Sequence, residues 1–129
     1  GHGAGLGSAL NVPMPPLADD GQYLAAFDTT IAPAARTFAP GVIVAQCGAD
    51  AHWSDPLTTL GLTLGGFKAL YQRIIALADE LCGGRLLATG GGGYSWQRVV
   101  PAAWTLLAGV LTGITLPDAL AADERSAPA

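Results

Sequence analysis

The stretch PGVIVAQCGAD, residues 40–50, decides the fold class of this chain. Pro40 and Gly41 interrupt the preceding segment, and Val42–Ala45 is a short continuous apolar run, the kind that forms a strand buried on both faces of a parallel sheet. A second apolar run, Arg85–Thr89, has the same character. A helical pattern separates the two runs and another follows the second, so the sequence predicts an α/β fold with a mainly parallel sheet.

Apolar residues at helical spacing predict three helices, over residues 21–38, 63–83 and 97–111. Asp19 and Asp20 are suitable caps for the first helix. Pro33 is expected to kink or divide that helix, because proline lacks the N–H that the helical ladder needs. Thr63 is expected to cap the second helix, and Gly83 to end it.

The composition is that of a packed, acidic chain. Half of the 129 residues are hydrophobic and 12% are charged, a balance opposite to that of disordered proteins. Six Lys+Arg against ten Asp+Glu give a net charge of −4, which leaves too few cations for the basic patch of a nucleic-acid-binding protein. The longest apolar stretch, Val99–Leu116, is interrupted by proline, glycine and threonine, so it is interpreted as a buried helix. Neither a nucleic-acid nor a membrane partner is expected.

The two cysteines, Cys47 and Cys82, lie far apart in apolar surroundings. We expect buried free thiols in a reducing cytoplasm rather than a disulfide. The length fits one small domain or part of a larger one, and the few strands need further neighbours to complete a sheet. Residues 9–13 are interpreted as the end of such a further strand. The sequence carries no sign of the oligomeric state.

Candidate functional residues follow the first strand, because ligands bind beyond the carboxyl ends of the strands in open α/β sheets. Asp50 lies there, and its carboxylate either caps the loop by accepting backbone N–H bonds or binds a metal; the spacing alone favours the capping role. His52 would complement Asp50 as a zinc ligand, but two residues do not make a complete site. Asp55, directly before Pro56, is interpreted as a turn former.

Four consecutive glycines, Gly90–Gly93, follow the second strand and precede Tyr94. Because each glycine costs backbone entropy on folding, the run indicates a close approach of the backbone to something. The candidates are a bound phosphate, a narrow substrate tunnel with the Tyr94 phenol at its base, and a plain tight turn with Tyr94 in the core. The dinucleotide-binding glycine pattern is not met. If the two strands are neighbours, Asp50 and Tyr94 are expected to face one pocket.

Taken in order, four motifs resemble the carboxyl-terminal half of the histone deacetylase superfamily. They are GHGAG with NVPMPP (residues 1–5 and 11–16), QCGADAH with DPL (46–52 and 55–57), LTLGGF (62–67), and GGGGY with VVPAAWT (90–94 and 99–105). The likeness covers residues 1–113 and is greatest to the bacterial acetoin utilization (AcuC) group. It implies an arginase/deacetylase-like three-layer α/β/α fold. Residues 1–113 are then the carboxyl-terminal portion of a catalytic domain, and residues 114–129 are a polar, alanine-rich tail.

The resemblance also implies a role for each candidate residue. Asp50 matches a zinc-binding aspartate of the family, and Tyr94 matches the tyrosine whose hydroxyl polarises the acetyl carbonyl and stabilises the oxyanion. His52 matches no ligand, which separates it in function from Asp50. The family's other zinc ligands, a D-x-H pair, and its adjacent His-His pair have no counterpart in this sequence. The tunnel for the acetyl-lysine side chain is implied to be lined by Leu57, Gly92 and Gly93.

The implied function is that of a zinc-dependent protein lysine deacetylase, which hydrolyses N-ε-acetyl-lysine to lysine and acetate. The partner is then an acetylated protein or a small acetyl-amide substrate. An acetylpolyamine or other acyl-amide hydrolase of the same superfamily is one alternative. A non-catalytic binding module is another, because the remaining zinc ligands are missing from these 129 residues. By themselves, these residues are expected to be inactive.

Overall fold

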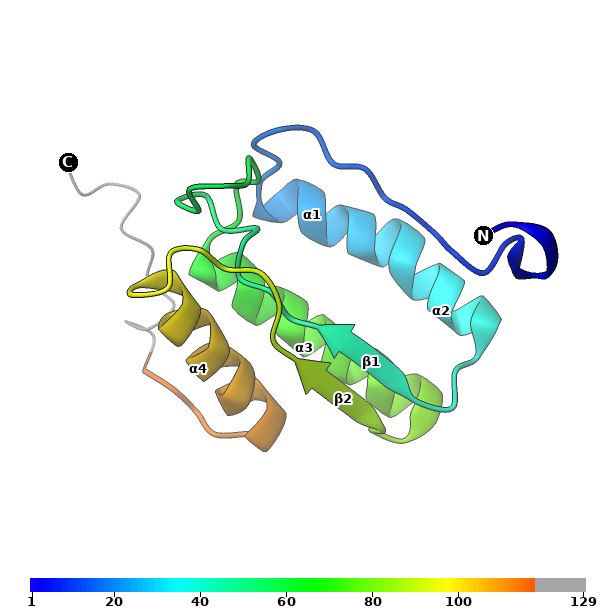
Figure 1. Cartoon of the computed structure of the whole chain (residues 1–129). Helices are drawn as coiled ribbons and strands as arrows, with labels where there is room; N and C mark the ends of the chain where they lie inside the picture. Colours follow the sequence, from blue (N-terminus) through cyan, green and yellow to red (C-terminus); the bar gives the residue numbers. More distant parts are fainter. Residues whose placement is uncertain (118–129) are drawn as a thin grey trace.

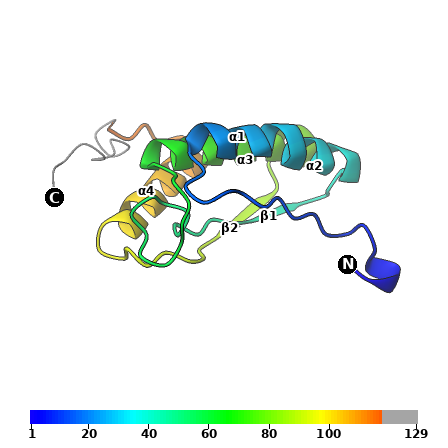
Figure 2. The ribbon, with the colours of Figure 1, turned by 90° about the horizontal axis from the view of Figure 1, so that it is seen from above.

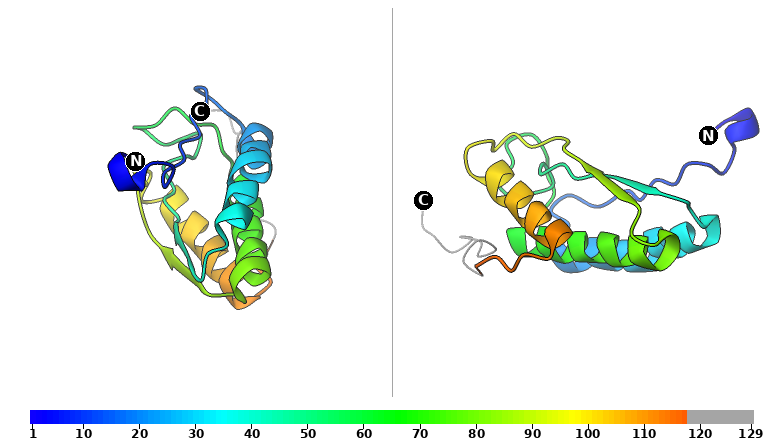
Figure 3. Two further views of the ribbon diagram at one scale, coloured as in Figure 1. Left: turned by 90° about the vertical axis from the view of Figure 1, so that its right-hand side faces the viewer. Right: turned by 90° about the horizontal axis from the view of Figure 1, so that it is seen from below.

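The computed structural model describes residues 1–117, which form two packed layers (Figure 1). One layer is a two-stranded parallel sheet, and the labelled helices lie together on one side of it (Figures 2 and 3). The α/β class with parallel strands is therefore confirmed. Of the predicted tail, residues 118–129 lie outside the described residues. In chain order the elements are η1 (Gly3–Gly5), α1 (Asp20–Ala26), η2 (Phe27–Ile31), α2 (Ala32–Phe38), β1 (Ile43–Gln46), α3 (Leu64–Cys82), β2 (Leu86–Thr89) and α4 (Val99–Thr112).

The unit β1–α3–β2 organises the fold. β1 and β2 pair in parallel, with Ile43–Gln46 opposite Leu86–Thr89. The connecting helix α3 is capped by the Thr63 side chain, which accepts a hydrogen bond from the Gly66 N–H. It ends at Gly83, whose φ of 60° is a left-handed conformation that glycine adopts without steric cost. Both predicted strands and both predicted ends of this helix are confirmed.

Only one face of the sheet is covered. Ala45 and Ala88 pack against the core, whereas Val44 and Leu87 lie opposite each other on the other face and are 64% and 56% exposed. The prediction of strands buried on both faces is wrong within the described residues, because all the labelled helices there cover the same face (Figures 2 and 3). Residues 9–13 form no strand, because no strand in the described part of the chain pairs with them.

The core lies between the sheet and the helices α3 and α4, which pack against each other. Burial of each large side chain in this core contributes about 1.5–3 kcal/mol to the free energy of folding. The core therefore dominates the stability of the packing between the sheet and the helices. Cys47 and Cys82 are both buried and free, as predicted. No helix within residues 1–117 combines the length and apolar character needed to cross a membrane. The central buried cluster consists of Cys47, Leu62, Phe67, Tyr71 and Leu106.

The first predicted helix is divided, as expected from Pro33. A π-helical turn, Phe27–Ile31, separates α1 from α2, and Pro33 lies in the first turn of α2. The N–H of Ala32 bonds to the carbonyl of Phe27, five residues back. This wider turn lets the helical ladder resume just before a residue that has no N–H to give.

Exposed ion pairs join this divided helix to α3. Arg36 bonds to Glu80 at 2.7 Å, and Arg73 bonds to Asp28 at 3.0 Å. All four side chains are between 37% and 50% exposed. Pairs this exposed contribute about 0–1 kcal/mol each, so they orient the two helices more than they stabilise them.

The aspartates before the first helix act on two different helices. Asp19 caps α1: its carboxylate accepts a hydrogen bond from the N–H of Gln22, whose side chain accepts one from the Asp19 N–H. Asp20 instead bonds to the start of α3, where its carboxylate accepts from the Thr63 N–H at 2.8 Å and from the Thr63 hydroxyl at 2.5 Å. The predicted cap is therefore confirmed for Asp19, and Asp20 ties α1 to the N-terminus of α3.

Replacement of Asp20 by alanine is expected to destabilise the chain by about 1–3 kcal/mol, because the Thr63 N–H loses a charged acceptor at a helix N-terminus. Urea unfolding followed by circular dichroism measures the loss. Asp79→Ala is the control: Asp79 is exposed near the carboxyl end of α3, and its replacement should change stability by less than about 0.5 kcal/mol. Equal effects of the two substitutions would contradict the bridging role of Asp20.

Candidate active site

The loops that follow β1 and β2 lie against each other. The parallel register places both carboxyl ends at one edge of the sheet, and the Cys47 N–H bonds to the Thr89 carbonyl at 2.8 Å just beyond it. Further along, the Ala49 N–H bonds to the Gly92 carbonyl at 2.6 Å. Trp104 of α4 donates its indole N–H to the Cys47 carbonyl at 3.0 Å and so anchors α4 to the same edge. The two strands are neighbours, which is the condition under which Asp50 and Tyr94 were expected to face one pocket.

The glycine run makes this close approach possible. A Cβ atom on Gly92 would lie 2.1 Å from one carboxylate oxygen of Asp50, which is well inside van der Waals contact. A Cβ atom on Gly48, in the facing loop, would lie 2.9 Å from the Gly92 nitrogen. The backbone of the glycine run therefore approaches the first loop and the Asp50 carboxylate, which is a requirement that the sequence alone did not identify.

Asp50 is half-buried at the carboxyl end of β1. Its backbone carbonyl accepts a hydrogen bond from the Thr58 hydroxyl, but no group within residues 1–117 donates one to its carboxylate. The loop-capping interpretation of Asp50 is therefore wrong. A partly desolvated carboxylate without donors is costly unless a cation or another polar partner is supplied.

Tyr23 of α1 faces the same region, a placement that sequence reasoning missed. Burial, and secondarily the negative charge of Asp50, raise the pKa of the Tyr23 hydroxyl above its usual value. The phenol therefore stays protonated near the carboxylate. In the sequence, Tyr23 is simply one member of the apolar stripe of its helix, so no local signal distinguishes it.

Asp55 does the capping that was predicted for Asp50. One carboxylate oxygen accepts from the Leu57 N–H at 2.9 Å, which confirms the predicted turn, and the other accepts from the Tyr94 N–H at 2.9 Å. Burial alone would raise the pKa of this carboxyl, but hydrogen bonds from the N–H groups of Tyr94, Leu57, Thr58 and Ser95 outweigh it and hold the pKa below the usual value. Its bond to Tyr94 was not foreseen.

Tyr94 lies on the surface of the described residues, 49% exposed. The alternative that placed it in the core is therefore wrong. It follows Gly93, whose φ of 152° is a conformation that other residues rarely adopt and whose Cβ would lie 2.7 Å from a methyl carbon of Val100. The chain bends at Tyr94, and the tyrosine side chain is exposed there.

His52 is a core residue and is separated from Asp50 in role. Its ring is 3% exposed and stacks on Phe67, with ring centroids 6.3 Å apart and planes 9° apart. Its Nδ1 lies 2.9 Å from the Ser54 hydroxyl. Within residues 1–117 there is no group of three or more His, Cys, Asp or Glu side chains placed to hold a metal. Asp50 is thus a single candidate ligand.

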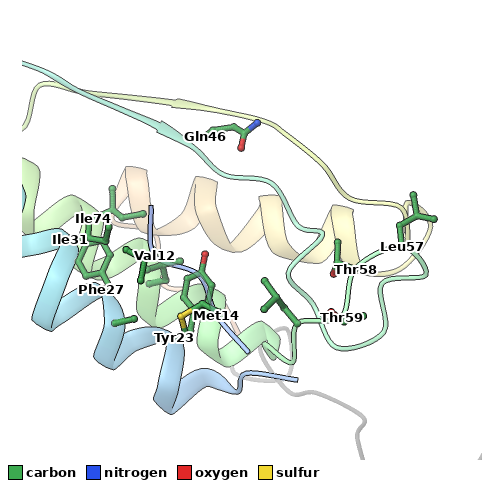
Figure 4. Close-up of a pocket in the computed structure, with 13 residues that line it drawn as sticks. Val12, Met14, Tyr23, Phe27, Ile31, Gln46, Leu57, Thr58, Thr59 and Ile74 are labelled. Carbon is green, nitrogen blue, oxygen red and sulfur yellow. The ribbon is translucent and has the colours of Figure 1, made fainter. Parts of the chain in front are cut away.

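Two adjoining cavities lie beside these loops. The larger, about 620 Å³, opens between α1, η2, α3 and the coil around Val12, and Leu57 lies at the end remote from Ile74 (Figure 4). The smaller, about 210 Å³, is lined by Asp50 and Tyr23 among others. Neither is lined by Tyr94, Gly92 or Gly93. The described residues therefore bring the backbones of the predicted site together but do not by themselves enclose one pocket around Asp50 and Tyr94.

Comparison with known proteins identifies the family. The model of the histone deacetylase domain matches residues 1–111. The acetoin utilization protein AcuC of Bacillus subtilis is 42% identical over 104 residues, which is 81% of this chain. Among solved structures, the HD domain of HDA15 superposes with a TM-score of 0.77 at 31% identity, over 93% of this chain and 33% of that one. An acetylpolyamine aminohydrolase from Burkholderia pseudomallei superposes with a TM-score of 0.75 at 27% identity, over 88% and 31% of the two chains.

These similarities confirm the predicted deacetylase-like fold and the likeness to the acetoin utilization group. The chain spans 27% of the length of the Bacillus relative, so it corresponds to about a quarter of that protein. The match over residues 1–111 includes both loops at the edge of the sheet. The chain belongs to the histone deacetylase domain family.

Proposed function

We propose that these residues form the carboxyl-terminal part of the active site of a zinc-dependent hydrolase that removes the acetyl group from N-ε-acetyl-lysine in proteins. The observation that carries the proposal is the Asp50 carboxylate, half-buried at the end of β1, without a hydrogen-bond donor within residues 1–117, and seated against the backbone of Gly92. Membership of the deacetylase family supports this chemistry.

Asp50 fits a zinc ligand by its chemistry and its surroundings. Carboxylate oxygen is a common zinc donor, and a cation would supply the partner that this carboxylate lacks. When bound, zinc supplies a Lewis acid for the amide carbonyl and for the attacking water. Since residues 1–117 hold no cluster of three ligands, the remaining ligands and the general base must come from outside them.

The other residues of the two loops have complementary roles in this proposal. The Tyr94 hydroxyl donates a hydrogen bond to the negative charge that develops on the acetyl oxygen, which is worth most when the donor is already oriented. Leu57 supplies an apolar wall for the methylene groups of the lysine side chain. Gly92 and Gly93 supply a tunnel wall without side chains in this proposal, and the absence of a Cβ at Gly92 leaves room for the Asp50 carboxylate.

An acetylated polyamine is the second candidate substrate. The specific observation in its favour is the structural similarity to an acetylpolyamine aminohydrolase. Assays with an acetyl-lysine peptide and with acetylated polyamines in parallel distinguish the two. A non-catalytic binding module is the third candidate, and it is favoured if nucleotides stabilise the chain while zinc with acetate does not.

The buried free thiols of Cys47 and Cys82 fit a reducing compartment, and we propose that the protein acts in the cytoplasm.

Activity is testable in a chimera in which residues 1–111 replace the matched segment of the Bacillus subtilis relative. We expect hydrolysis of an acetyl-lysine peptide that a zinc chelator abolishes. Tyr94→Phe, which removes one hydrogen-bond donor to the developing oxyanion, should lower kcat by about 100-fold or more.

The exposed Tyr94 sits in a loop, so its replacement should leave folding intact, and thermal unfolding of the chimera checks this. Trp96→Phe, in the same exposed loop, is the matched control and should retain activity. Chelator-insensitive turnover, or full activity of Tyr94→Phe, would exclude the proposed mechanism.

The 129-residue chain alone is expected to be inactive and to lose zinc during gel filtration in metal-free buffer, because one carboxylate does not hold the ion. Metal analysis of the eluted protein and a peptide deacetylation assay measure both properties. Retention of one equivalent of zinc together with turnover would show that the chain contains a complete site.

Gly92→Ala should disturb the Asp50 carboxylate while leaving every titratable residue of the chain in place. The added Cβ would lie 2.1 Å from an Asp50 oxygen, so either the carboxylate or the loop must move. We expect the chimera to lose most of its zinc, as it should with Asp50→Asn. Gly41→Ala is the matched control, because a Cβ at Gly41 meets nothing within 4 Å. Full zinc content in Gly92→Ala would argue against Asp50 as a ligand.

A further inference from the structure

Asp55 occupies an unusual position between the two loops of the candidate site. It belongs to the loop after β1 and is only 8% exposed, yet no cation is needed to stabilise it, because its oxygens accept hydrogen bonds from backbone N–H groups. It lies 39 positions before Tyr94 in the sequence, so the bond between them is a tertiary contact rather than a turn.

The two oxygens of Asp55 serve two different loops. Oδ1 accepts from the N–H groups of Leu57 at 2.9 Å and Thr58 at 3.3 Å, on its own side. Oδ2 accepts from the N–H of Tyr94 at 2.9 Å, and the N–H of Ser95 also bonds to this carboxylate. A single carboxylate therefore joins the chain at Leu57, in the proposed tunnel wall, to the chain at Tyr94.

The hydrogen bond from the Tyr94 N–H to Asp55 lies just beyond the last backbone hydrogen bond between the two loops. The backbone hydrogen bond between the two loops that lies farthest from the sheet runs from the Ala49 N–H to the Gly92 carbonyl. Gly93 follows with a φ of 152°, and the chain bends at Tyr94. Because Tyr94 lies at this bend and its side chain is half exposed, packing of the side chain does little to fix its position. The hydrogen bonds to Asp55 hold the backbone at this point.

We propose that Asp55 is a positioning residue, which fixes the backbone of Tyr94 relative to Leu57 and to the Asp50 loop. The inference rests on the proposed function for the catalytic importance of Tyr94, but the contact itself does not. The four donors make aspartate the suitable residue. An asparagine in its place must direct its NH2 group toward N–H donors on one side, so it can satisfy one loop and not both.

If Asp55 were only a turn former, asparagine would serve nearly as well, because Asn and Asp both form such turns. Asp55→Asn therefore separates the two roles. The effect is measured in two independent ways, one on the 129-residue chain and one on the active chimera.

On the chain itself, amide hydrogen exchange followed by NMR reports on the Tyr94 and Ser95 N–H groups directly. We expect Asp55→Asn to accelerate exchange at these two amides by about tenfold or more, because their acceptor is lost. Asp79→Asn, at an exposed site on α3, is the matched control and should leave them unchanged. Unchanged exchange in Asp55→Asn, or wild-type exchange at Tyr94 as fast as in the exposed segment Leu6–Leu10, would overturn the proposal.

In the chimera, Asp55→Asn should lower kcat by about tenfold or more and leave KM nearly unchanged, since the displaced group acts in the transition state. In a Tyr94→Phe background the same substitution should have little further effect. An equal reduction in both backgrounds would overturn positioning of Tyr94 as the cause. If Tyr94→Phe retains full activity, the proposed function fails, while the exchange measurement still supports or overturns the contact.

Discussion

The parallel pairing of β1 with β2 is the constraint on which the candidate site depends. The pairing extends over only four residues of each strand. It makes the two segments that follow the strands leave the sheet at the same edge and in the same direction. The following loops then continue side by side, with the Ala49 N–H bonded to the Gly92 carbonyl. The two loops lie so close together that no side chain fits between them, which explains why positions 48 and 92 are glycines.

Two aspartates in the loop after β1 differ in their electrostatic surroundings. Asp55 accepts backbone N–H bonds from both loops and is satisfied by the protein itself. Asp50 receives no such bond to its carboxylate within residues 1–117 and lies against the Gly92 backbone. The same chemical group is therefore satisfied by backbone donors at one position and lacks them within residues 1–117 at the other. Donors in the fold, rather than residue type, make the difference.

Much of the fold was predictable from sequence, because helical and strand periodicities, caps and glycine ends are local signals. The capping of α3 by Thr63, its termination at Gly83 and the division of the first helix near Pro33 were predicted from such signals and confirmed. The exposed face at Val44 and Leu87 was not predicted. A continuous apolar run shows that a strand can be covered on both faces, but not whether the covering elements lie among the described residues.

The sequence by itself determined the family, the α/β class and the candidate residues Asp50 and Tyr94, because these depend on motifs that are contiguous in the chain. The tertiary structure decided which aspartate caps the loops, since the bond from Asp55 to Tyr94 spans 39 positions and exists only after β1 and β2 have paired. It also decided that the glycine run faces the Asp50 carboxylate. Hydrogen-bond donors and steric room are properties of neighbours in space, and parallel strands bring together neighbours that are distant in sequence.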